Sequence, residues 1–345
     1  MFLEIPFEKT KKNTVFIDVR SEGEYDEAHI PGAVNIPLFT NEERQVIGTA
    51  YKNDSVSEAR KLGIQYASNR LPQIYEAILN LKDSHDRQLV AYCARGGYRS
   101  TFFASAFSSI GVGVLKLDGG YKRYRNYIID QLPVLNSNLN YIVLHGNTGT
   151  GKTKVLKSLT SHGLDVLDLE GAANHRGSVL GSVGLGSCNT QKQFESNIFH
   201  QMQSFKGVEV FVEAESRKIG NVLVPSCVHE KMKTGVHILI EEKIDYRVRV
   251  IKEDYTQKIG FQEEILQSLT YLKKYLSKEK LDKLSRYIKE GNIDDAVSDL
   301  MINYYDPLYG NKSDKYEYQL VLSGIADPEK AAQTIKKWIE KTDKQ

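Results

Sequence analysis

The sequence predicts an α/β protein with two parallel-sheet domains, one over residues 1–135 and one over residues 136–345, the second ending in a helical region. Two observations predict this fold class. Short apolar runs of strand length alternate with stretches of helical apolar spacing, which is typical of parallel sheets covered on both faces. A glycine-rich phosphate-loop motif also follows a strand-like run near the middle of the chain. The 345 residues are enough for two domains with separate cores.

In the first domain, strand runs alternate with helical runs. The strand runs are 15–19, 89–92 and 114–117, and helical apolar spacing covers 71–81 and 100–110. The stretch 131–138 contains Pro, Asn and Ser without apolar periodicity, so we place a turn-rich domain boundary there.

The second domain opens with the strand run 141–144, and a helix is expected to begin near Lys152. Three further strand runs are 166–170, 208–212 and 236–240. From Phe261 onward the pattern becomes helical and rich in Lys, Tyr and Leu.

The composition excludes a protein that attracts nucleic acid by its overall charge. The 46 Lys and Arg residues against 44 Asp and Glu residues leave a formal charge of +2, so any such partner is bound by local patches. No run approaches the ~18 apolar residues of a membrane helix, and the N-terminal segment has no signal-peptide core. The three cysteines do not form a disulfide framework. We therefore expect a cytoplasmic protein without membrane association.

The segment 92–100 places Cys93 in a loop rich in Gly and Arg, directly after a strand run. Backbone N–H groups and the start of the next helix stabilise an anion there, so we expect a thiolate at Cys93 or a bound oxyanion. Arg95 and Arg99 add positive charge, and Gly96-Gly97 allows a tight curl. The spacing Cys93-x5-Arg99 also fits a phosphatase-type loop, so this segment alone leaves sulfur and phosphate chemistry open.

Residues 146–153 form a complete Walker A sequence, placed after a strand and at a helix N-terminus as phosphate binding requires. The residues predicted to bind phosphate are Gly146, Asn147, Thr148, Gly149, Thr150, Gly151, Lys152 and Thr153. Lys152 supplies a point charge for terminal phosphates, and the Thr153 hydroxyl is a candidate Mg²⁺ ligand. The motif predicts a P-loop NTPase-like domain.

Charged residues follow the strand runs near this loop. We expect Glu213 or Glu215 to orient Mg²⁺-bound water or to act as a base, and Arg217 to contact phosphate. Asp168 and Glu170 end the strand run after the Walker helix and should face the same crevice. An ordinary strand-end turn is the alternative for Glu213, Glu215 and Arg217.

Two further groups of polar residues are candidates for function. Asp18, Arg20 and Glu24 are expected either to form a charged network at the end of the first strand or to be a solvated ion-pair cluster. The eight histidines have no spacing typical of a zinc site, and His175 is the candidate functional histidine among them.

The first domain resembles the rhodanese family over roughly residues 10–130. The motifs that carry this resemblance are Ile17-Asp18-Val19-Arg20, Glu24, His29 to Pro37, and Cys93-Ala94-Arg95-Gly96-Gly97. The resemblance implies a rhodanese-like domain whose Cys93 thiolate carries sulfur or selenium as a persulfide or its selenium analogue.

The whole chain resembles the tRNA 2-selenouridine synthases, bacterial fusions of a rhodanese domain with a P-loop domain. The motifs are Gly48-Thr49-Ala50-Tyr51-Lys52 with the nearby Gly63, Cys93 to Ser100, Gly119-Gly120-Tyr121-Lys122, Asp168 to Gly171, His175 to Ser178, Glu213 to Arg217 with Ile219-Gly220, and Tyr304 to Tyr309. The Gly-rich stretch Gly181 to Asn189 matches no motif that we can place.

This resemblance implies a two-step reaction on 2-thiouridine at the wobble position of tRNA. Geranyl diphosphate first geranylates the thiocarbonyl sulfur, and selenophosphate then replaces the S-geranyl group with selenium. The residues expected to be catalytic are Cys93, Arg95, Arg99, Glu213 and Glu215, and Arg176 is expected to join the phosphate-binding residues. We expect no tightly bound cofactor, with Mg²⁺ as a candidate ion.

Two basic segments are candidates for tRNA binding. Residues 121–125 interleave Lys122, Arg123 and Arg125 with tyrosines that include Tyr121, as expected of a surface that stacks bases and binds phosphate. Lys52 is a further candidate. The lysine-rich stretch 273–286 also contains acidic residues, so a solvated, ion-paired face explains it equally well.

Two other functions stay open from the residues alone. In one, the Walker loop binds ATP, and the chain is an ATP-dependent phosphotransferase fused to a sulfur-carrier module. In the other, the chain is a non-enzymatic sensor of tRNA or nucleotide, which has no need of a reactive thiolate.

Overall fold

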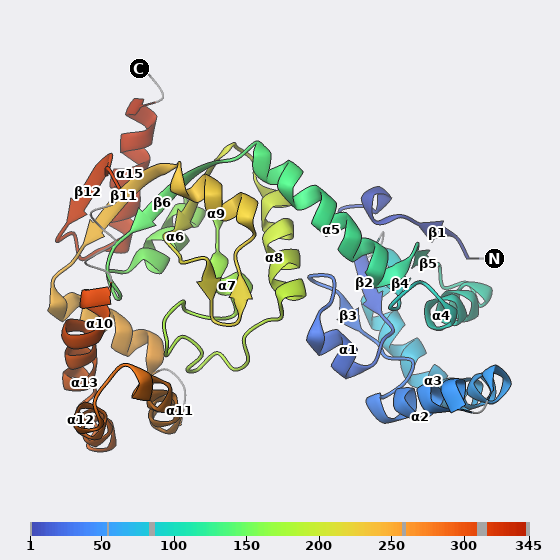
Figure 1. The fold of residues 1–345 in the computed structure, drawn as a ribbon. Coiled ribbons are helices and arrows are strands. Elements are labelled where there is room, and N and C mark those ends of the chain that lie inside the picture. Colours follow the sequence, from blue (N-terminus) through green and yellow to red (C-terminus); the bar gives the residue numbers. More distant parts are fainter. Residues whose placement is uncertain (1, 54, 83–86, 257–259, 309–315, 343–345) are drawn as a thin grey trace. The chain divides into compact units, whose positions relative to one another are not determined.

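The structure, a computed structural model, describes residues 2–53, 55–82, 87–256, 260–308 and 316–342, and the chain divides into two units over residues 1–131 and 132–345 (Figure 1). The sequence placed this boundary four residues later, between residues 135 and 136. The predicted turn-rich linker is wrong, because helix α5 (Gly120–Ser137) continues through the stretch with Pro133 inside it. Leu132 and Asn136 are buried along this helix, and packing has outweighed the weak local helical signal.

The first unit contains a parallel sheet in the order β1-β5-β4-β2-β3. Its strands are β1 (Glu4–Ile5), β2 (Thr14–Asp18), β3 (Val34–Asn35), β4 (Gln88–Tyr92) and β5 (Val114–Leu117). The three predicted strands are confirmed as β2, β4 and β5. Because Asp18 pairs with Tyr92 at the carboxyl ends of neighbouring strands, the residues after β2 and β4 meet at one edge of the sheet.

Helices cover this sheet on both faces, as the alternating pattern predicts. They are α1 (Glu22–Glu27), α2 (Asn41–Asn53), α3 (Val56–Lys82), α4 (Tyr98–Ser109) and α5, with a short 3₁₀ turn η1 (Phe7–Lys9). Ile78 of α3 and Phe103 of α4 pack against Ile17 and Leu89 in one continuous core.

The second unit contains a parallel sheet in the order β12-β11-β6-β8-β7. Its strands are β6 (Asn140–His145), β7 (Val166–Leu167), β8 (Glu209–Glu213), β11 (Val236–Glu241) and β12 (Leu320–Ser323). A small antiparallel pair, β9 (Lys218–Ile219) and β10 (Val222–Leu223), follows β8. The run 166–170 is a strand only as far as Leu167, because the Asp168 side chain caps the N-terminus of the next helix.

The helices of the second unit form two groups. Beside the sheet lie α6 (Lys152–Ser161), α7 (Leu169–Ala173), α8 (Gln191–Ser204), α9 (Ser226–Lys233) and α15 (Pro328–Thr342), whereas α10 (Ile244–Tyr255) packs against the second, helical group. A helical group with its own core contains α11 (Phe261–Leu269), η2 (Thr270–Lys274), α12 (Lys278–Lys289), α13 (Ile293–Leu300) and the π-helical turn η3 (Met301–Tyr305). The predicted helical C-terminal region is confirmed as far as η3, but the chain then returns to the sheet as β12 and α15.

Alternate residues of β6 point to opposite faces of the second sheet. Ile142 and Leu144 pack with Leu156 of α6 and Ile335 of α15 in the core. Among the residues that the structure describes, no helix combines the length and the apolar composition that crossing a membrane would need.

Candidate functional site

The Cys93 loop connects the end of β4 to the start of α4. Gly97 occupies the N-cap position of α4, so the first free N–H groups of this helix belong to the turn that carries the thiol. The Cys93 sulfur is buried and lies 3.2 Å from the Ser100 hydroxyl, which can donate a hydrogen bond to a thiolate. The thiol itself has the Gly97 carbonyl as a second neighbour at 3.8 Å.

The start of α5, with Gly120 as its first residue, lies against the back of this loop. The N–H groups of Tyr121 and Lys122 donate to the carbonyls of Cys93 and Ala94, each at 2.9 Å. A Cβ atom at Gly120 would lie 2.3 Å from the Cys93 carbonyl oxygen, and Gly120 has φ +58°, so glycine is required at this approach.

The two arginines predicted beside Cys93 have different positions. Arg95 is exposed. Arg99 forms a two-pronged ion pair with Glu24 at 2.6 and 3.2 Å, so its charge is already paired within the first unit. A catalytic role of either arginine stays a prediction.

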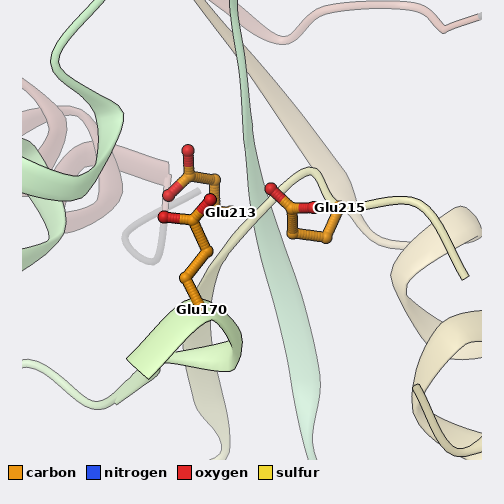
Figure 2. A group of neighbouring side chains, drawn as sticks. All are labelled: Glu170, Glu213 and Glu215. Atoms are coloured by element: carbon orange, nitrogen blue, oxygen red, sulfur yellow. The ribbon is translucent and has the colours of Figure 1, made fainter. Parts of the chain in front are cut away.

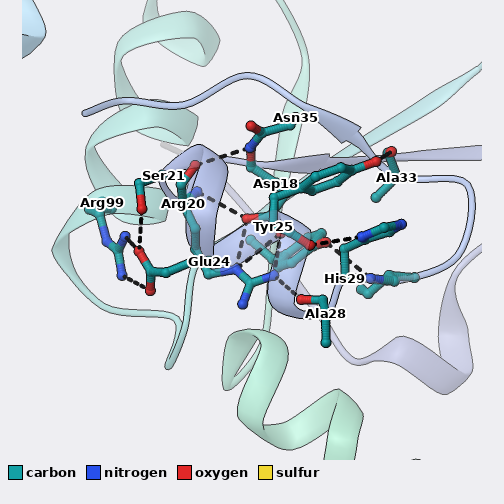
Figure 3. A network of polar contacts seen from close by, with 12 residues as sticks. Asp18, Arg20, Ser21, Glu24, Tyr25, Ala28, His29, Ala33, Asn35 and Arg99 are labelled. Atoms are coloured by element: carbon teal, nitrogen blue, oxygen red, sulfur yellow. Dashed lines mark hydrogen bonds and ion pairs between the residues drawn. The ribbon is translucent and has the colours of Figure 1, made fainter. Parts of the chain in front are cut away.

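The predicted charged network at the end of β2 is present, with Asp18 and Arg20 buried and Glu24 half-buried, so the alternative of a solvated cluster is wrong for Asp18 and Arg20 (Figure 3). Asp18, fully buried, accepts hydrogen bonds from the backbone N–H and the Nε of Arg20, each at 2.9 Å. The Arg20 guanidinium also donates to the Ala28 carbonyl at 2.6 Å. Burial raises the pKa of the Glu24 carboxyl. The hydrogen bond from Arg99 and the charges of Arg99 and Arg44 lower this pKa by more than burial raises it, so the net shift is downward.

The predicted tRNA-binding segment at the start of α5 has its basic residues and its tyrosines in different environments. Lys122 and Arg123 are exposed, and Arg123 pairs with Asp118. Tyr121 is buried, and the Arg20 guanidinium lies 4.4 Å from the centre of its ring. Arg125 is half-buried, and burial lowers its pKa. The expected interleaving with exposed aromatic rings is therefore wrong at Tyr121, whereas Lys122 stays available to phosphate.

The other basic candidates for tRNA binding lie on helices. Lys52 is exposed near the end of α2. In the lysine-rich stretch, Lys283 of α12 pairs with Asp299 at 2.6 Å, as a solvated, ion-paired face would.

The phosphate loop lies between β6 and α6, and α6 begins at Lys152 as predicted. Gly146, Gly149 and Gly151 have φ values of +148°, +82° and +83°, which side chains other than glycine rarely adopt. The Lys152 ammonium donates to the Gly146 carbonyl at 2.9 Å and lies 3.3 Å from a Glu213 oxygen. Lys152 therefore lies over the loop, where a phosphate group would meet it.

Three carboxylates gather beside this loop, and Figure 2 shows Glu170 of α7 facing Glu213 and Glu215, which come from the end of β8 and the segment after it. Their nearest oxygens all lie within 4.8 Å of one another. The Thr153 hydroxyl donates to Glu213 at 3.0 Å. Burial first, and then the charges of Glu213 and Glu215, raise the pKa of Glu170 far above its ordinary value.

This cluster fits a divalent cation by two observations. A Cβ atom at Gly177 would lie 2.7 Å from a Glu215 oxygen and 3.0 Å from a Glu170 oxygen, so glycine leaves the space beside these carboxylates open. The donor set of carboxylate and hydroxyl oxygens is the one that Mg²⁺ prefers. The sequence had named Glu213, Glu215 and Thr153 for this role, and Glu170 joins them from α7 rather than from a strand end.

Three more predicted residues lie on the loops around the cluster. Arg176 donates to the carbonyls of Val183 and Asp254 at 2.6 and 3.0 Å, so a phosphate contact would have to break these bonds. Arg217 is exposed and reaches Ser226 at 3.3 Å. His175 is buried, which lowers its pKa, and its Nδ1 atom has no hydrogen-bond partner among the described residues.

The sequence reasoning missed a buried arginine that holds the phosphate loop. Arg247 of α10 donates from Nε to the Thr148 carbonyl at 2.8 Å and pairs through both terminal nitrogens with Asp306 at 2.9 and 2.6 Å. Asp306 belongs to the motif Tyr304 to Tyr309, of which Tyr309 lies outside the described residues. An arginine and an aspartate 59 positions apart give no sequence signal of their pairing.

The sequence reasoning also missed a pair of histidines next to the loop. His145 ends β6, and its Nε2 atom lies 2.9 Å from Nδ1 of His237 on β11. Burial, and then the nearby His237 and Lys152, lower the pKa of His145 to about 4. Burial also lowers the pKa of His237, so both rings are neutral at neutral pH.

Comparison with known proteins covers almost the whole chain. A family model described as "tRNA 2-selenouridine synthase AAA domain" matches residues 139–344, and one described as "Rhodanese-like domain" matches residues 7–127. The chain is 30% identical to a tRNA 2-selenouridine synthase of Hydrogenovibrio crunogenus, over 92% of this chain and 94% of that protein. It is 32% identical to one of Pseudomonas syringae pv. syringae, over 89% and 91%. It is 34% identical to one of Nitrosomonas europaea, over 74% and 68%.

Proposed function

The chain belongs to the tRNA 2-selenouridine synthase family and is a tRNA-modifying transferase, and from this premise we propose that it exchanges the sulfur of a wobble 2-thiouridine for selenium in two steps. The observation that carries the proposal is that one chain holds a buried cysteine in an N–H-rich loop and a phosphate loop beside three carboxylates. We assign the geranyl step to the second unit and the selenium step to the first.

In the geranyl step, the thiouridine sulfur attacks the first carbon of geranyl diphosphate, the carbon–oxygen bond breaks, and diphosphate leaves with the electron pair. The N3–H proton of the base is lost to water, so the S-geranylated base is neutral. The N–H groups of the phosphate loop and the Lys152 ammonium would bind the departing diphosphate. Glu170, Glu213, Glu215 and Thr153 would hold Mg²⁺, which supplies further positive charge to the leaving group. Lys152 is well placed for this role because it already lies over the loop, 2.9 Å from the Gly146 carbonyl.

In the selenium step, selenium from selenophosphate replaces the geranylthio group at C2 of the base. The C2–S bond breaks, a C2–Se bond forms, geranylthiol leaves, and the phosphate group is released from selenium by water. We assign Cys93 to this step because the surrounding turn offers a hydroxyl at 3.2 Å and helix N-terminal N–H groups to an anion. A thiol that acts as its anion, together with a tRNA substrate, fits the cytoplasm.

Two variants separate the steps on an anticodon stem-loop RNA that carries 2-thiouridine, with the product nucleosides measured by mass spectrometry. We expect Lys152→Ala to slow geranylation by about 10²–10³, which is the usual effect of removing one preorganised electrostatic donor. Lys154→Ala is the matched control, since Lys154 lies on the same helix but pairs with Glu253. Geranylation by Lys152→Ala at the wild-type rate would refute the assignment of the phosphate loop.

The second variant is Cys93→Ser. A serine hydroxyl is not ionised at neutral pH, so we expect selenouridine to disappear while geranylated thiouridine accumulates. Cys227→Ser, at a cysteine of the second unit, is the control. Wild-type amounts of selenouridine from Cys93→Ser contradict the role of this thiol.

A further inference from the structure

A cavity of about 300 Å³ opens beside the phosphate loop, on the face of the second sheet opposite α6. Its polar end is formed by Gly146, Asn147 and Lys152 of the loop. Its other walls come from β6, β11, α9 and the segment before β12. The volume lies at the lower end of the range for small-molecule sites, about 300–1,000 Å³.

The histidine pair forms part of these walls, and three of its four ring nitrogens take part in hydrogen bonds within the protein. The His237 Nε2–H donates to the Lys233 carbonyl at 3.3 Å, so its Nδ1 is left to accept the hydrogen bond from the His145 Nε2–H at 2.9 Å. Both nitrogens of His237 and one of His145 are therefore used within the protein. Because the pKa values of both rings are lowered, the pair carries no charge at neutral pH.

Aromatic and apolar side chains complete the end of the cavity away from the loop. The Tyr316 ring lies 4.2 Å from the His237 ring and 4.8 Å from the His145 ring, between centroids. Met232 of α9 and Leu239 of β11 also line the cavity. One end of the space thus carries the charge of Lys152. The other offers polarisable rings and a thioether, beside Lys233, whose ammonium pairs with Glu230 at 3.1 Å.

We infer that this cavity holds the branched alkenyl chain of an allylic diphosphate, with the diphosphate bound at Lys152. The inference rests on the geranyl step proposed above and assigns its chain-binding residues. When the carbon–oxygen bond breaks, the electron pair leaves with diphosphate and the allyl group gains positive charge. The neutral faces of His145, His237 and Tyr316 stabilise that charge without competing for the sulfur's electrons.

Two other assignments fit the observations less well. A nucleobase in the cavity would be recognised by hydrogen bonds, but the histidine nitrogens are mostly engaged with each other and with the backbone. A second cavity near Thr148 and Ile251 is more apolar, but its volume of about 50 Å³ is too small for a ten-carbon chain.

The test is the preference between geranyl diphosphate and farnesyl diphosphate, which is one isoprene unit longer. Met232→Ala enlarges the cavity, and we expect the kcat/KM ratio of farnesyl to geranyl diphosphate to rise about tenfold or more, the discrimination that small changes of apolar size give. Met202→Ala is the matched control: both methionines are helical and 4% exposed, but Met202 lies on α8 and does not line the cavity. An unchanged ratio in soluble Met232→Ala enzyme overturns the inference.

A binding measurement covers the case in which Met232→Ala does not fold. Tyr316→Ala should weaken binding of the unreactive geranyl thiolodiphosphate about tenfold and leave inorganic pyrophosphate binding unchanged. Equal affinities of the wild type and Tyr316→Ala for geranyl thiolodiphosphate overturn the inference. A Tyr316→Ala protein whose sole defect is a raised KM for the thiouridine RNA overturns it too. If geranylation requires Lys152 but the chain-length preference does not change in Met232→Ala, this inference is wrong and the proposed function stands. If geranylation does not require Lys152, the proposed function itself is refuted.

Discussion

The cluster of Glu170, Glu213 and Glu215 predicts a measurable instability in the absence of a cation. Two unit charges 4.8 Å apart repel by about 3.5 kcal/mol at an effective dielectric constant of about 20. The three carboxylate pairs of the cluster together repel by about 10 kcal/mol when all are ionised, and Lys152, 3.3 Å from Glu213, offsets about 5 kcal/mol of this on the same scale. Burial first, and then the remaining repulsion from Glu213 and Glu215, keep a proton on the folded cluster and raise the pKa of Glu170 to about 10.

The sign of the pH dependence follows from that raised pKa. Above the ordinary pKa of a glutamate, the unfolded chain has lost the proton that the folded cluster still holds, so stability falls as pH rises toward the folded pKa. One such proton changes the free energy of unfolding by about 1.4 kcal/mol per pH unit. Glu170→Gln replaces the titrating carboxyl by an amide of nearly the same shape, which needs no proton to stay neutral. We expect the variant to gain about 2–3 kcal/mol over wild type between pH 6 and pH 8.

Urea unfolding followed by tryptophan fluorescence measures this difference. The chain has one tryptophan, Trp338 of α15, which packs against the core of the second unit and reports its unfolding. Glu279→Gln, at an exposed residue of α12, is the control and should leave the pH slope unchanged. A Glu170→Gln protein with the wild-type pH slope would refute the reasoning.

Mg²⁺ provides the complementary measurement. An ion bound by the carboxylates displaces the shared proton, so millimolar Mg²⁺ should stabilise the wild type more at pH 8 than at pH 6. The Glu170→Gln variant should gain less from Mg²⁺ at both values. Equal stabilisation of the two proteins by Mg²⁺ would show that Glu170 is not a ligand.

Two predictions concern the first unit. Because the pKa of Glu24 is lowered in the folded protein, this carboxylate contributes to stability above its unfolded pKa, and the contribution is lost as pH falls through the folded pKa. Glu24→Gln should therefore destabilise the first unit by about 1–2 kcal/mol at pH 7 and by little at pH 3. Urea unfolding followed by circular dichroism checks this, and an equal loss at both pH values contradicts the ion pair with Arg99 as its source. Lys122→Ala should weaken tRNA binding and reduce the slope of log affinity against log salt by about 1, and an unchanged slope would place the RNA elsewhere.

The sequence predicted the central strands because each is a run of four to six residues that is apolar enough to be recognised. It missed β1 and β3, which have two residues each, and β12, in which Leu322 alone is fully buried. A strand at the edge of a sheet needs no continuous apolar run, so local patterning does not reveal it.

The site shows the same division between local and distant information. Lys152 and Thr153 were predicted because their role is set by spacing within eight residues. The contacts of His145 with His237, and of Arg247 with Asp306, join residues 92 and 59 positions apart, and the fold alone brings them together. Burial of Tyr121 under Arg20 was missed for that reason too, since a basic and aromatic segment reads locally as an exposed surface.

Because the chain is synthesised from its N-terminus, the late position of α15 in the sequence affects when the second unit can complete its core. The helix that begins at Lys152 is covered by Ala331, Ala332 and Ile335, and the sheet edge beside it is completed by β12. A chain emerging from the ribosome thus has every strand of its first unit long before it has α15, which covers α6, the helix after the phosphate loop. Until α15 is synthesised, the hydrophobic side of α6 lacks its native packing partner. A nascent chain that stops before residue 320 can therefore complete the cysteine-bearing first unit, while the phosphate-binding second unit stays incomplete.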